Sequence, residues 1–261
     1  TSNPYVVCEK TDGVRFMMLA FIYENKKQCV FLNRALEMFS CPLNFRKPVY
    51  DGTILEGEMY GDTFMIYDIL IECGKVVGNV DFLTRLKSVE NVKKMLTSLK
   101  YDPIKLKIKT FHLMDDYKMF METYLPTVTQ DVDGLIFTPI NEPIKTGTHE
   151  TMFKWKPRDK NTIDFQLKKR GNIWKMYVQE RGKLMFESEI LEEQVPLHAR
   201  EWMEEDAIIE CQYMHKDTPM WWKPILRRYD KTFPNGRRTF YRTLVNIKED
   251  ISMKDFMNCI P

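Results

Sequence analysis

Apolar runs bounded by turn residues dominate the first half of the chain. The run from Val14 to Tyr23 begins directly after Thr11-Asp12-Gly13, and Gly61-Asp62 separates two further runs. Such runs are typical of strands, and two of them joined by a short turn are typical of a hairpin. The pattern predicts strands over residues 5–8, 14–23, 29–33, 54–60, 63–72, 135–138 and 151–155.

Residues 81–99 have a different spacing, because their apolar side chains recur every three or four positions. This period predicts an amphipathic helix, and we expect a second helix over residues 115–125. The apolar positions of the first helix are Phe82, Leu86, Val89, Val92 and Leu96.

The hydrophobic pattern of the sequence changes after Pro157, and we place a domain boundary there. Short alternating runs turn at Gly171 and Gly182, which predicts a small antiparallel barrel. The tail over residues 251–260 is predicted to be helical, with Ser252 as its cap. The barrel strands are expected over residues 162–168, 174–179, 183–189 and 207–213.

Composition excludes several classes of protein. Hydrophobic residues make up 44% of the chain and aromatic residues 13%, which is enough for a buried core and disfavours intrinsic disorder. The longest apolar run, residues 16–23, is far shorter than the ~20 residues that cross a bilayer, and no signal segment opens the chain. The six cysteines show neither a CxxC nor a His-paired spacing, which indicates reduced thiols rather than a disulfide framework or a zinc site.

The net charge of +2 conceals an uneven distribution. Residues 154–175 and 223–242 are strongly basic, whereas residues 187–210 between them are strongly acidic. This pattern suits a protein that handles phosphates locally, although solvated faces of ordinary elements explain it equally well.

Lys10 carries the strongest chemical signal, at the end of an apolar strand in Glu9-Lys10-Thr11-Asp12-Gly13. A lysine is nucleophilic only when neutral, and its ordinary pKa near 10.4 keeps it protonated at pH 7. Burial, cationic neighbours or a metal must offset about 4–5 kcal/mol. Arg15, Lys154 and Lys156 are the candidate neighbours, and a surface lysine beside a turn is the alternative interpretation.

Five further segments follow Lys10 in order along the chain. They are Glu56-Gly57-Glu58, Phe64-Met65-Ile66-Tyr67-Asp68, Asp133-Gly134-Leu135-Ile136, Phe153-Lys154-Trp155-Lys156-Pro157 and Arg228-Tyr229-Asp230-Lys231. The ordered set resembles the covalent lysyl-nucleotidyltransferases, the superfamily of mRNA capping guanylyltransferases and polynucleotide ligases. The opening and closing segments are similar to those of capping guanylyltransferases from large DNA viruses, with African swine fever virus as a candidate source.

The resemblance implies an α+β fold. A nucleotidyltransferase domain of antiparallel sheets with flanking helices would cover residues 1–157, its N-terminal part lying upstream of Thr1. An OB-fold β-barrel would follow over residues 158–245, and a C-terminal helix over residues 246–261 would pack back on the first domain.

The resemblance also implies the chemistry. Lys10 would attack the α-phosphate of GTP, release pyrophosphate and carry GMP as a lysyl-N–GMP phosphoramidate. The GMP would then pass to the diphosphate 5′ end of RNA and form the GpppRNA cap.

Eight residues are expected to bind the nucleotide by their match to the family: Glu9, Arg15, Arg34, Glu58, Tyr67, Lys109, Lys154 and Lys156. Arg15 and Arg34 would hold the sugar and phosphate as bidentate donors, although Arg34 follows an Asn where the family commonly has an acidic residue. Tyr67 would stack on guanine, with a core position as the alternative. Lys109 would donate to the guanine O6, with a solvated strand face as the alternative. Glu9, the residue before Lys10, is also expected to bind the nucleotide.

Glu58 and Asp133 are expected to bind Mg²⁺ or Mn²⁺ directly or through water, because these ions prefer oxygen ligands. The family usually has Asp where this chain has Glu56, so Glu56 receives no role. A turn aspartate before glycine is the alternative interpretation of Asp133.

The remaining site residues are basic or lie among basic residues. Lys154 and Lys156 alternate around Trp155 on one strand face and would neutralise the α-phosphate during transfer. The expected helpers of pyrophosphate departure are Arg228, Asp230 and Lys231.

Two other functions stay open from the sequence: an ATP-dependent polynucleotide ligase built on the same lysine, and a non-catalytic RNA-binding OB module. The expected partners are GTP and 5′-diphosphate RNA, with no membrane. We also expect a longer polypeptide or a complex that supplies RNA triphosphatase and methyltransferase activities. The expected location is the host cytoplasm or virion for a viral protein, and the nucleus otherwise.

Overall fold

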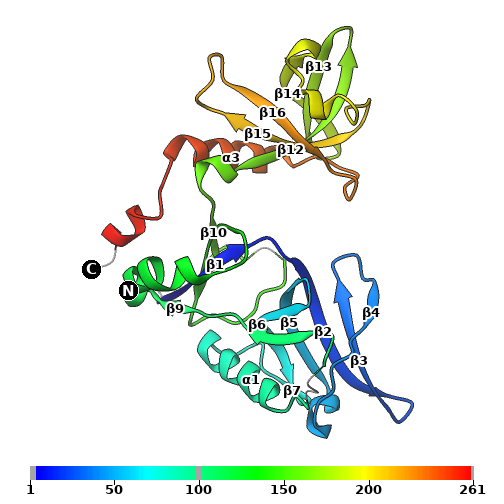
Figure 1. The fold of residues 1–261 in the computed structure, drawn as a ribbon, viewed down its shortest axis with the longest axis vertical. Coiled ribbons are helices and arrows are strands. Elements are labelled where there is room, and N and C mark those ends of the chain that lie inside the picture. The colour runs from blue at the N-terminus through cyan, green and yellow to red at the C-terminus, as the bar shows by residue number, and fades with distance from the viewer. Residues whose placement is uncertain (1–3, 98–100, 148, 260–261) are drawn as a thin grey trace. The chain divides into compact units, whose positions relative to one another are not determined.

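The chain divides into two compact units, Thr1–Trp155 (unit 1) and Lys156–Cys259 (unit 2) (Figure 1). The computed structural model describes residues 4–97, 101–147 and 149–259. Within this part of the chain, no helix is both long and apolar enough to cross a membrane. The packing of a C-terminal helix on the first domain stays a prediction.

Two sheets build unit 1. The larger has seven strands in the order β4-β3-β2-β5-β6-β7 with β8 paired to β6, and the smaller has the order β11-β10-β1-β9. All pairs are antiparallel except the parallel pair β6–β8. The strands are β1 (Tyr5–Thr11), β2 (Val14–Tyr23), β3 (Lys26–Asn33), β4 (Met38–Ser40), β5 (Thr53–Tyr60), β6 (Thr63–Glu72), β7 (Lys75–Val76), β8 (Lys105–Ile108), β9 (His112–Leu113), β10 (Val132–Pro139) and β11 (Phe153–Trp155).

Helix α1 (Phe82–Lys94) begins where Asp81 accepts a 3.0 Å hydrogen bond from the Thr84 amide. It ends before the predicted residue 99, because the next residues pair with the segment around Phe45: Met95 O accepts from Arg46, and Thr97 donates to Asn44 O. The predicted second helix is present as an uninterrupted but irregular helical run, which passes from 3₁₀ (Met114–Asp116) through α2 (Tyr117–Met119) and a π-helix (Phe120–Tyr124) back to 3₁₀ (Leu125–Thr127).

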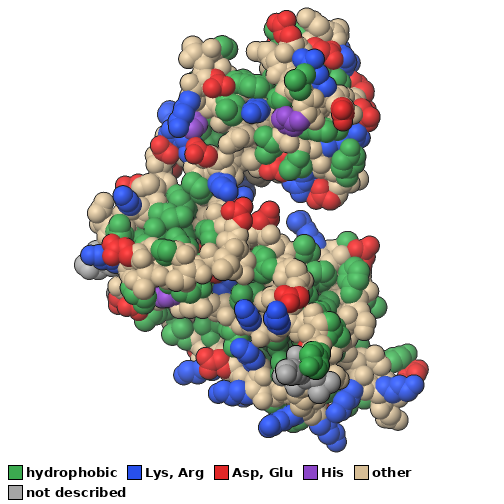
Figure 2. Space-filling model, viewed as in Figure 1, with side chains coloured by type: hydrophobic (Ala, Val, Ile, Leu, Met, Phe, Trp, Pro, Cys, Tyr) green, Lys and Arg blue, Asp and Glu red, His purple; other side chains and the backbone are tan. Residues whose placement is uncertain are grey.

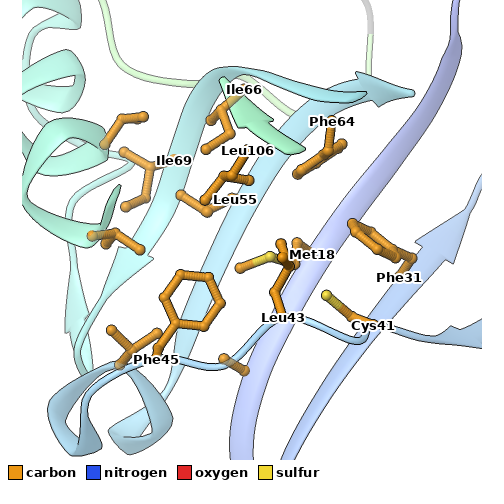
Figure 3. Close-up of a cluster of buried hydrophobic side chains, with 14 of the residues drawn as sticks. Met18, Phe31, Cys41, Leu43, Phe45, Leu55, Phe64, Ile66, Ile69 and Leu106 are labelled. Atoms are coloured by element: carbon orange, nitrogen blue, oxygen red, sulfur yellow. The ribbon is translucent and has the colours of Figure 1, made fainter. Parts of the chain in front are cut away.

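The core of unit 1 lies between the large sheet, helix α1 and the segment around Leu43 and Phe45 (Figure 3). Met18, Leu55 and Ile66 are fully buried there, as the inward positions of alternating strands. Burying side chains of this kind contributes roughly 1.5–3 kcal/mol each. The sheet that carries the larger part of the candidate site is therefore firmly anchored.

Unit 2 is a five-stranded antiparallel sheet in the order β14-β13-β12-β15-β16. This is the strand order of an OB-fold, a five-stranded, partly open Greek-key barrel. The edge strands β14 and β16 contact each other, but no backbone ladder joins them within the described residues, so the barrel is not closed. The strands are β12 (Thr162–Arg170), β13 (Ile173–Glu180), β14 (Lys183–Leu191), β15 (Ile208–Met214) and β16 (Trp221–Arg227).

Two elements of unit 2 lack a counterpart in the predicted pattern. Strand β16 completes the sheet, and helix α3 (Arg237–Glu249) starts well before residue 246. Phe240 and Ile247 of α3 are buried in the core of unit 2. Among the described residues of the tail, which end at Cys259, Asp255–Cys259 forms a short 3₁₀ helix and the rest is not helical.

The charge blocks of the sequence recombine into ion pairs in unit 2. Basic residues of the two basic stretches contact acidic residues of the stretch between them, so charges of both signs are interspersed on the face in view (Figure 2). The basic stretches are therefore not free phosphate-binding surfaces along their whole length. The pairs are Lys168–Asp206, Lys169–Glu192, Arg227–Glu204 and Arg237–Glu187.

Candidate active site

A β-bulge brings Lys10 and Asp133 together. Lys10 lies opposite Gly134 in the β1–β10 ladder, but Thr11 lies opposite Val132, so Asp133 is the extra residue of β10. A bulge re-aims the side chain of its extra residue. The Lys10 Nζ donates to both carboxylate oxygens of Asp133 at 3.0 Å. Because the lysine side chain is only 22% exposed and ion-paired, it is not an ordinary surface lysine.

A cavity of about 600 Å³ lies in unit 1 beside this pair. Five residues of the predicted site line it, together with the apolar side chains of Phe82, Phe111, Ile136 and Met152. Lys10 and Asp133 are not lining residues, but Lys154 lines the cavity and is close enough to Lys10 for the charge of Lys10 to lower its pKa. The five predicted residues are Arg15, Glu58, Tyr67, Lys109 and Lys154.

A second bulge shapes the cavity wall at Tyr67. Glu56 lies opposite Asp68 and Gly57 opposite Ile66, so Tyr67 is the extra residue of β6. Its side chain is partly buried and lines the cavity instead of joining the sheet core. Burial and the nearby carboxylate of Glu56 raise the pKa of Tyr67, so its hydroxyl stays neutral.

Glu56 has a structural role that the sequence did not suggest. It accepts a 2.8 Å hydrogen bond from the Arg15 guanidinium, and both side chains line the cavity. The pair brings the Arg15 guanidinium, which is expected to hold the nucleotide, to the less exposed carboxylate of Glu56 at the cavity wall. In the sequence, the role of Glu56 could have been inferred only from its alternation with Glu58, which places both side chains on one face of the strand.

Thr11, Tyr60 and Glu58 form a polar cluster on one side of the cavity. The Tyr60 hydroxyl donates to the Glu58 carboxylate and contacts the Thr11 hydroxyl, and Thr11 Oγ1 lies 3.3 Å from the same carboxylate oxygen. The Tyr60 ring also occupies the space that a Cβ at Gly13 would need, within 2.5 Å. This contact explains why the turn after Lys10 requires glycine at that position.

Lys109 is buried, so it does not lie on a solvated strand face. Its residue is 8% exposed, and its Nζ lies 3.2 Å from Thr11 Oγ1 and 3.5 Å from Glu9 Oε1. Glu9 is equally buried, at 4%. Lys109 and Glu9 therefore form a buried ion pair at the wall of the cavity.

Lys154 brings a second positive charge close to Lys10. It lies on β11 opposite Ile136. Loss of solvent around the side chain, then repulsion by Lys10 and Arg15, lowers the pKa of Lys154. Concentrated positive charge of this kind attracts a phosphate. Cys8 offers no competing nucleophile, because burial raises the pKa of its thiol to about 12.

An ion pair that the sequence analysis missed, Arg85–Asp68, also lines the cavity. Arg85 of α1 donates from Nε to Asp68 at 2.8 Å and from Nη1 to the Val80 and Glu142 carbonyl oxygens. Arg85 is 2% exposed and Asp68 7%. An arginine in a helix is usually solvated, so the sequence offers no reason to expect this ion pair. The pair is revealed only by the packing of Arg85 against Asp68 of β6.

Several predicted residues lie elsewhere. Arg34 is exposed in the turn after β3 and does not line the cavity. Lys156 is the first residue of unit 2, where its backbone oxygen accepts a 3.4 Å hydrogen bond from Asn161. The shared strand face predicted for Lys154 and Lys156 therefore ends at Trp155, the last residue of β11.

The three predicted residues of unit 2 form a cluster of their own around Asp164. Arg228 Nη1 lies 3.3 Å from both Asp164 oxygens, and Lys231 donates to the same carboxylate. Asp230 accepts from Arg228 at 2.8 and 2.9 Å. These contacts hold the segment on β12 and partly neutralise its positive charge.

The side chains of Glu58 and Asp133 are of the chemical type that binds a hard divalent cation. Glu58 and Asp133 supply the oxygen donors that Mg²⁺ and Mn²⁺ prefer, and Mg²⁺ commonly binds one or two carboxylates together with water and phosphate oxygens. Among the described residues, no three His, Cys, Asp or Glu side chains are grouped to hold a metal by themselves. An ion here would therefore need further oxygen ligands from water or phosphate.

A family model for the mRNA capping enzyme catalytic domain matches residues 1–158, and a model for the mRNA capping enzyme C-terminal domain matches residues 136–257. Together these matches cover both units and the junction between them. The chain belongs to the mRNA capping enzyme family.

Curated relatives come from animals and fungi. The chain is 29% identical to the mRNA-capping enzyme of Mus musculus, over 91% of this chain and 43% of that protein. It is 26% identical to the mRNA-capping enzyme subunit alpha of Schizosaccharomyces pombe, over 98% of this chain and 75% of that protein. The chain spans less than half the length of the mouse and Danio rerio relatives. A viral source stays a prediction.

Among solved structures, the chain is similar to the ATP-dependent DNA ligase of bacteriophage T7 in complex with ATP. The TM-score is 0.44 at 15% identity, covering 87% of this chain and 93% of that chain. Chlorella virus DNA ligase-adenylate gives a TM-score of 0.38 at 12% identity, covering 88% and 94%.

Proposed function

We propose that this chain is the guanylyltransferase of an mRNA capping system and carries GMP covalently on Lys10. The observation that supports the proposal most is the Lys10–Asp133 pair, set beside a cavity whose wall carries Arg15 and Lys154. In a chain of the mRNA capping enzyme family, a partly buried lysine amine with cationic neighbours is suited to attack a phosphate.

In the first step, the Lys10 Nζ lone pair forms a bond to the α-phosphorus of GTP. The bond from that phosphorus to the bridging oxygen breaks, and its electron pair leaves with pyrophosphate. Asp133, at 3.0 Å, is the acceptor for the proton that Nζ must lose. Arg15 and Lys154 stabilise the charge on the phosphoryl oxygens, because phosphoryl transfer depends mainly on position and electrostatics.

In the second step, an oxygen of the 5′-diphosphate end of RNA attacks the same phosphorus. The phosphorus–nitrogen bond breaks, and Lys10 leaves as an amine that regains a proton. A bound Mg²⁺ or Mn²⁺, held by Glu58 and Asp133, would supply Lewis-acid stabilisation of phosphate charge. Arg228, Asp230 and Lys231 act in the first step of this proposal, on the outer phosphates of GTP that leave as pyrophosphate. Lys156 acts on the α-phosphate.

The proposed partners follow from this reaction. The substrates are GTP and 5′-diphosphate RNA, and a triphosphatase must supply the diphosphate end. The Schizosaccharomyces pombe relative is named as a subunit, and we propose that this chain likewise works with triphosphatase and methyltransferase activities. The nucleus is the proposed location for a cellular protein.

The test is incubation of the chain with α-³²P-labelled GTP or ATP and Mg²⁺ or Mn²⁺, followed by denaturing electrophoresis and peptide mass spectrometry. We expect label from GTP on Lys10, stable in alkali and lost in acid, because a phosphoramidate is cleaved when its nitrogen is protonated. Transfer to diphosphate RNA should then release the label from the protein. Label from ATP alone, or alkali-labile label on another residue, would contradict the proposal.

A further inference from the structure

Two cysteines of unit 1 lie directly opposite each other across the hairpin of β3 and β4. The register that pairs Val30 with Ser40 continues by one position to this pair. The Cys41 amide donates a 3.0 Å hydrogen bond to the Cys29 carbonyl oxygen. We propose that Cys29 and Cys41 are a redox-modification site, at which a hydroperoxide converts the two thiols into an intramolecular disulfide. This inference does not depend on the proposed guanylyltransferase function.

The backbone already holds Cys29 and Cys41 at a separation that suits a disulfide. Two opposite residues joined by such a hydrogen bond have Cα atoms about 5.5 Å apart, and disulfides join residues with Cα atoms ~4.4–6.8 Å apart. Opposite residues also project to the same face of the sheet. Because Cys41 follows the last residue of β4, its backbone can adjust as the sulfur atoms approach. Bond formation therefore needs an adjustment at one end of the hairpin and no rearrangement of the sheet.

The two thiols have different surroundings. Cys41 is 6% exposed and lies beside Phe31 and Leu43 in the core of unit 1 (Figure 3), whereas Cys29 is partly exposed and packs against that core. Hydrogen bonding from the Cys29 thiol lowers the pKa of Cys41, and the Leu43 amide lowers it further, against the opposing effect of burial. Cys41 is therefore the thiolate of the pair, and a molecule as small as hydrogen peroxide reaches it past Cys29.

The proposed reaction has two steps and consumes one molecule of hydrogen peroxide. The Cys41 thiolate attacks a peroxide oxygen, the O–O bond breaks, and hydroxide leaves, which gives a sulfenic acid on Cys41. The Cys29 sulfur then attacks the Cys41 sulfur, the S–O bond breaks, and a second hydroxide leaves. The protons released by the two thiols convert both hydroxides to water. The thiols lose two electrons, and these electrons reduce the peroxide to two water molecules.

The environments of Cys8, Cys73 and Cys211 disfavour the same reaction there. A thiol reacts with an oxidant as the thiolate. Burial raises the pKa of Cys8 to about 12 and that of Cys211 well above its ordinary value. Cys73 is partly exposed, but loss of solvent and the nearby carboxylate of Glu72 raise its pKa. Peroxide should therefore modify the Cys29–Cys41 pair before these three thiols.

The disulfide would cross-link the edge of the large sheet. Strand β4 is the edge strand, its three residues are exposed, and β3 is its neighbour in the sheet. The new bond would tie the end of β4 to β3 and close the hairpin into a covalent ring. Neither Cys29 nor Cys41 lines the unit 1 cavity. Oxidation therefore acts on the hairpin and not on the wall of the candidate active site.

The experiment exposes the chain to increasing concentrations of hydrogen peroxide and detects the disulfide by mass spectrometry without reductant. Trypsin cleaves after Lys27, Arg34 and Arg46, so Cys29 and Cys41 fall in separate peptides that only a disulfide joins. Amide hydrogen exchange over residues 38–41 measures the effect on β4. Dimedone, which reacts with sulfenic acids, reports the intermediate.

The variants separate the two thiols from each other and from an unrelated thiol. Cys29→Ser removes one sulfur but keeps a hydroxyl donor beside Cys41, and Cys41→Ala removes the attacking thiolate. Cys73→Ser is the matched control, because Cys73 is also a partly exposed thiol of unit 1. Thermal unfolding of every variant shows whether it is folded.

We expect the parent and Cys73→Ser to lose two hydrogens in mass and to yield the joined peptides, and dithiothreitol to reverse both changes. Exchange of the β4 amides should slow by about tenfold in the oxidised protein. Neither Cys29→Ser nor Cys41→Ala should yield the joined peptides. Cys29→Ser should instead carry dimedone on Cys41.

Sulfinic or sulfonic acid on Cys41 of the parent without joined peptides would overturn the inference, as would a disulfide between any other two cysteines. Folded Cys29→Ser without dimedone on Cys41 would overturn the assignment of the attacking thiol. Equal exchange before and after disulfide formation would overturn the effect on β4. If Cys41→Ala does not fold, the parent and Cys29→Ser decide the matter. GMP loading on Lys10 is measured separately, so failure here and failure of the proposed function are distinguishable.

Discussion

Lys10 and Asp133 are 123 positions apart in the chain, yet the lysine Nζ lies 3.0 Å from both oxygens of the aspartate. The pair exists because β10 has one extra residue opposite the end of β1. In the proposed reaction Asp133 has two roles, as the acceptor of the lysine proton and as a metal ligand.

Asp133→Asn should slow GMP loading by about a hundredfold, the usual contribution of a positioned general base. The amide cannot accept the lysine proton, but it keeps the shape and a hydrogen-bond acceptor. Rapid-quench measurement of covalent GMP would check this. Loading at the parent rate would show that Asp133 serves only the fold.

Lys10→Arg should abolish covalent labelling while the protein stays folded. A guanidinium remains protonated and has no lone pair for attack, but it can keep the ion pair with Asp133. Mass spectrometry after GTP exposure and thermal unfolding are the two measurements. Residual labelling above a few per cent would place the nucleophile elsewhere.

Gly57→Ala should destabilise unit 1 by about 1–3 kcal/mol, the usual cost of overpacking. A Cβ at Gly57 would lie 2.5 Å from the Met65 carbonyl oxygen and 2.7 Å from the Phe64 ring. Urea denaturation would measure the loss. Gly236→Ala is the control, because its Cβ would meet nothing closer than 3.9 Å, and an equal loss in both variants would contradict the steric explanation.

Asp68→Asn should cost about 3–5 kcal/mol of folding free energy, because it leaves the buried Arg85 charge without its counter-ion. The matched control is Asp62→Asn, whose pair with Lys105 is mostly exposed and therefore contributes little to stability. Chemical denaturation of both variants tests the difference. A similar small loss in each would mean that the Asp68–Arg85 pair is not essential to unit 1.

Asp230→Asn should alter the acid stability of unit 2. The Arg228 guanidinium lowers the pKa of Asp230 from 3.8 to about 2. A lowered carboxyl pKa gives stability that is present above pH 3.8 and is lost as the pH falls through about 2. The parent should therefore unfold at higher urea concentration than the variant at pH 5, and this difference should shrink at pH 2. The difference is expected to be small and salt-sensitive, because the Asp230 side chain is 65% exposed. A difference that is constant with pH would exclude the charge as its cause.

The sequence by itself determined the elements whose patterns are local. Strands β2 and β6 have the predicted bounds, because alternation and flanking turn residues act within a few positions. Helix α1 starts one residue after the predicted start at residue 81, because Asp81 caps it, and its end depends on contacts with the distant segment around Phe45. Helix α3 was missed, since its buried residues Phe240 and Ile247 are scattered among basic ones.

The candidate site divides in the same way. The order of motifs indicated Lys10, Glu58 and Lys154, which do gather at or beside one cavity. Only the tertiary structure decided that Asp133 binds Lys10, and that Arg228 and Lys231 bind Asp164. A bulge and a strand register bring together residues far apart in the chain, and a charge acquires its partner only when those strands pair. Sequence spacing fixes which residues share a face of one element, whereas the approach of two elements is set by packing over the whole unit.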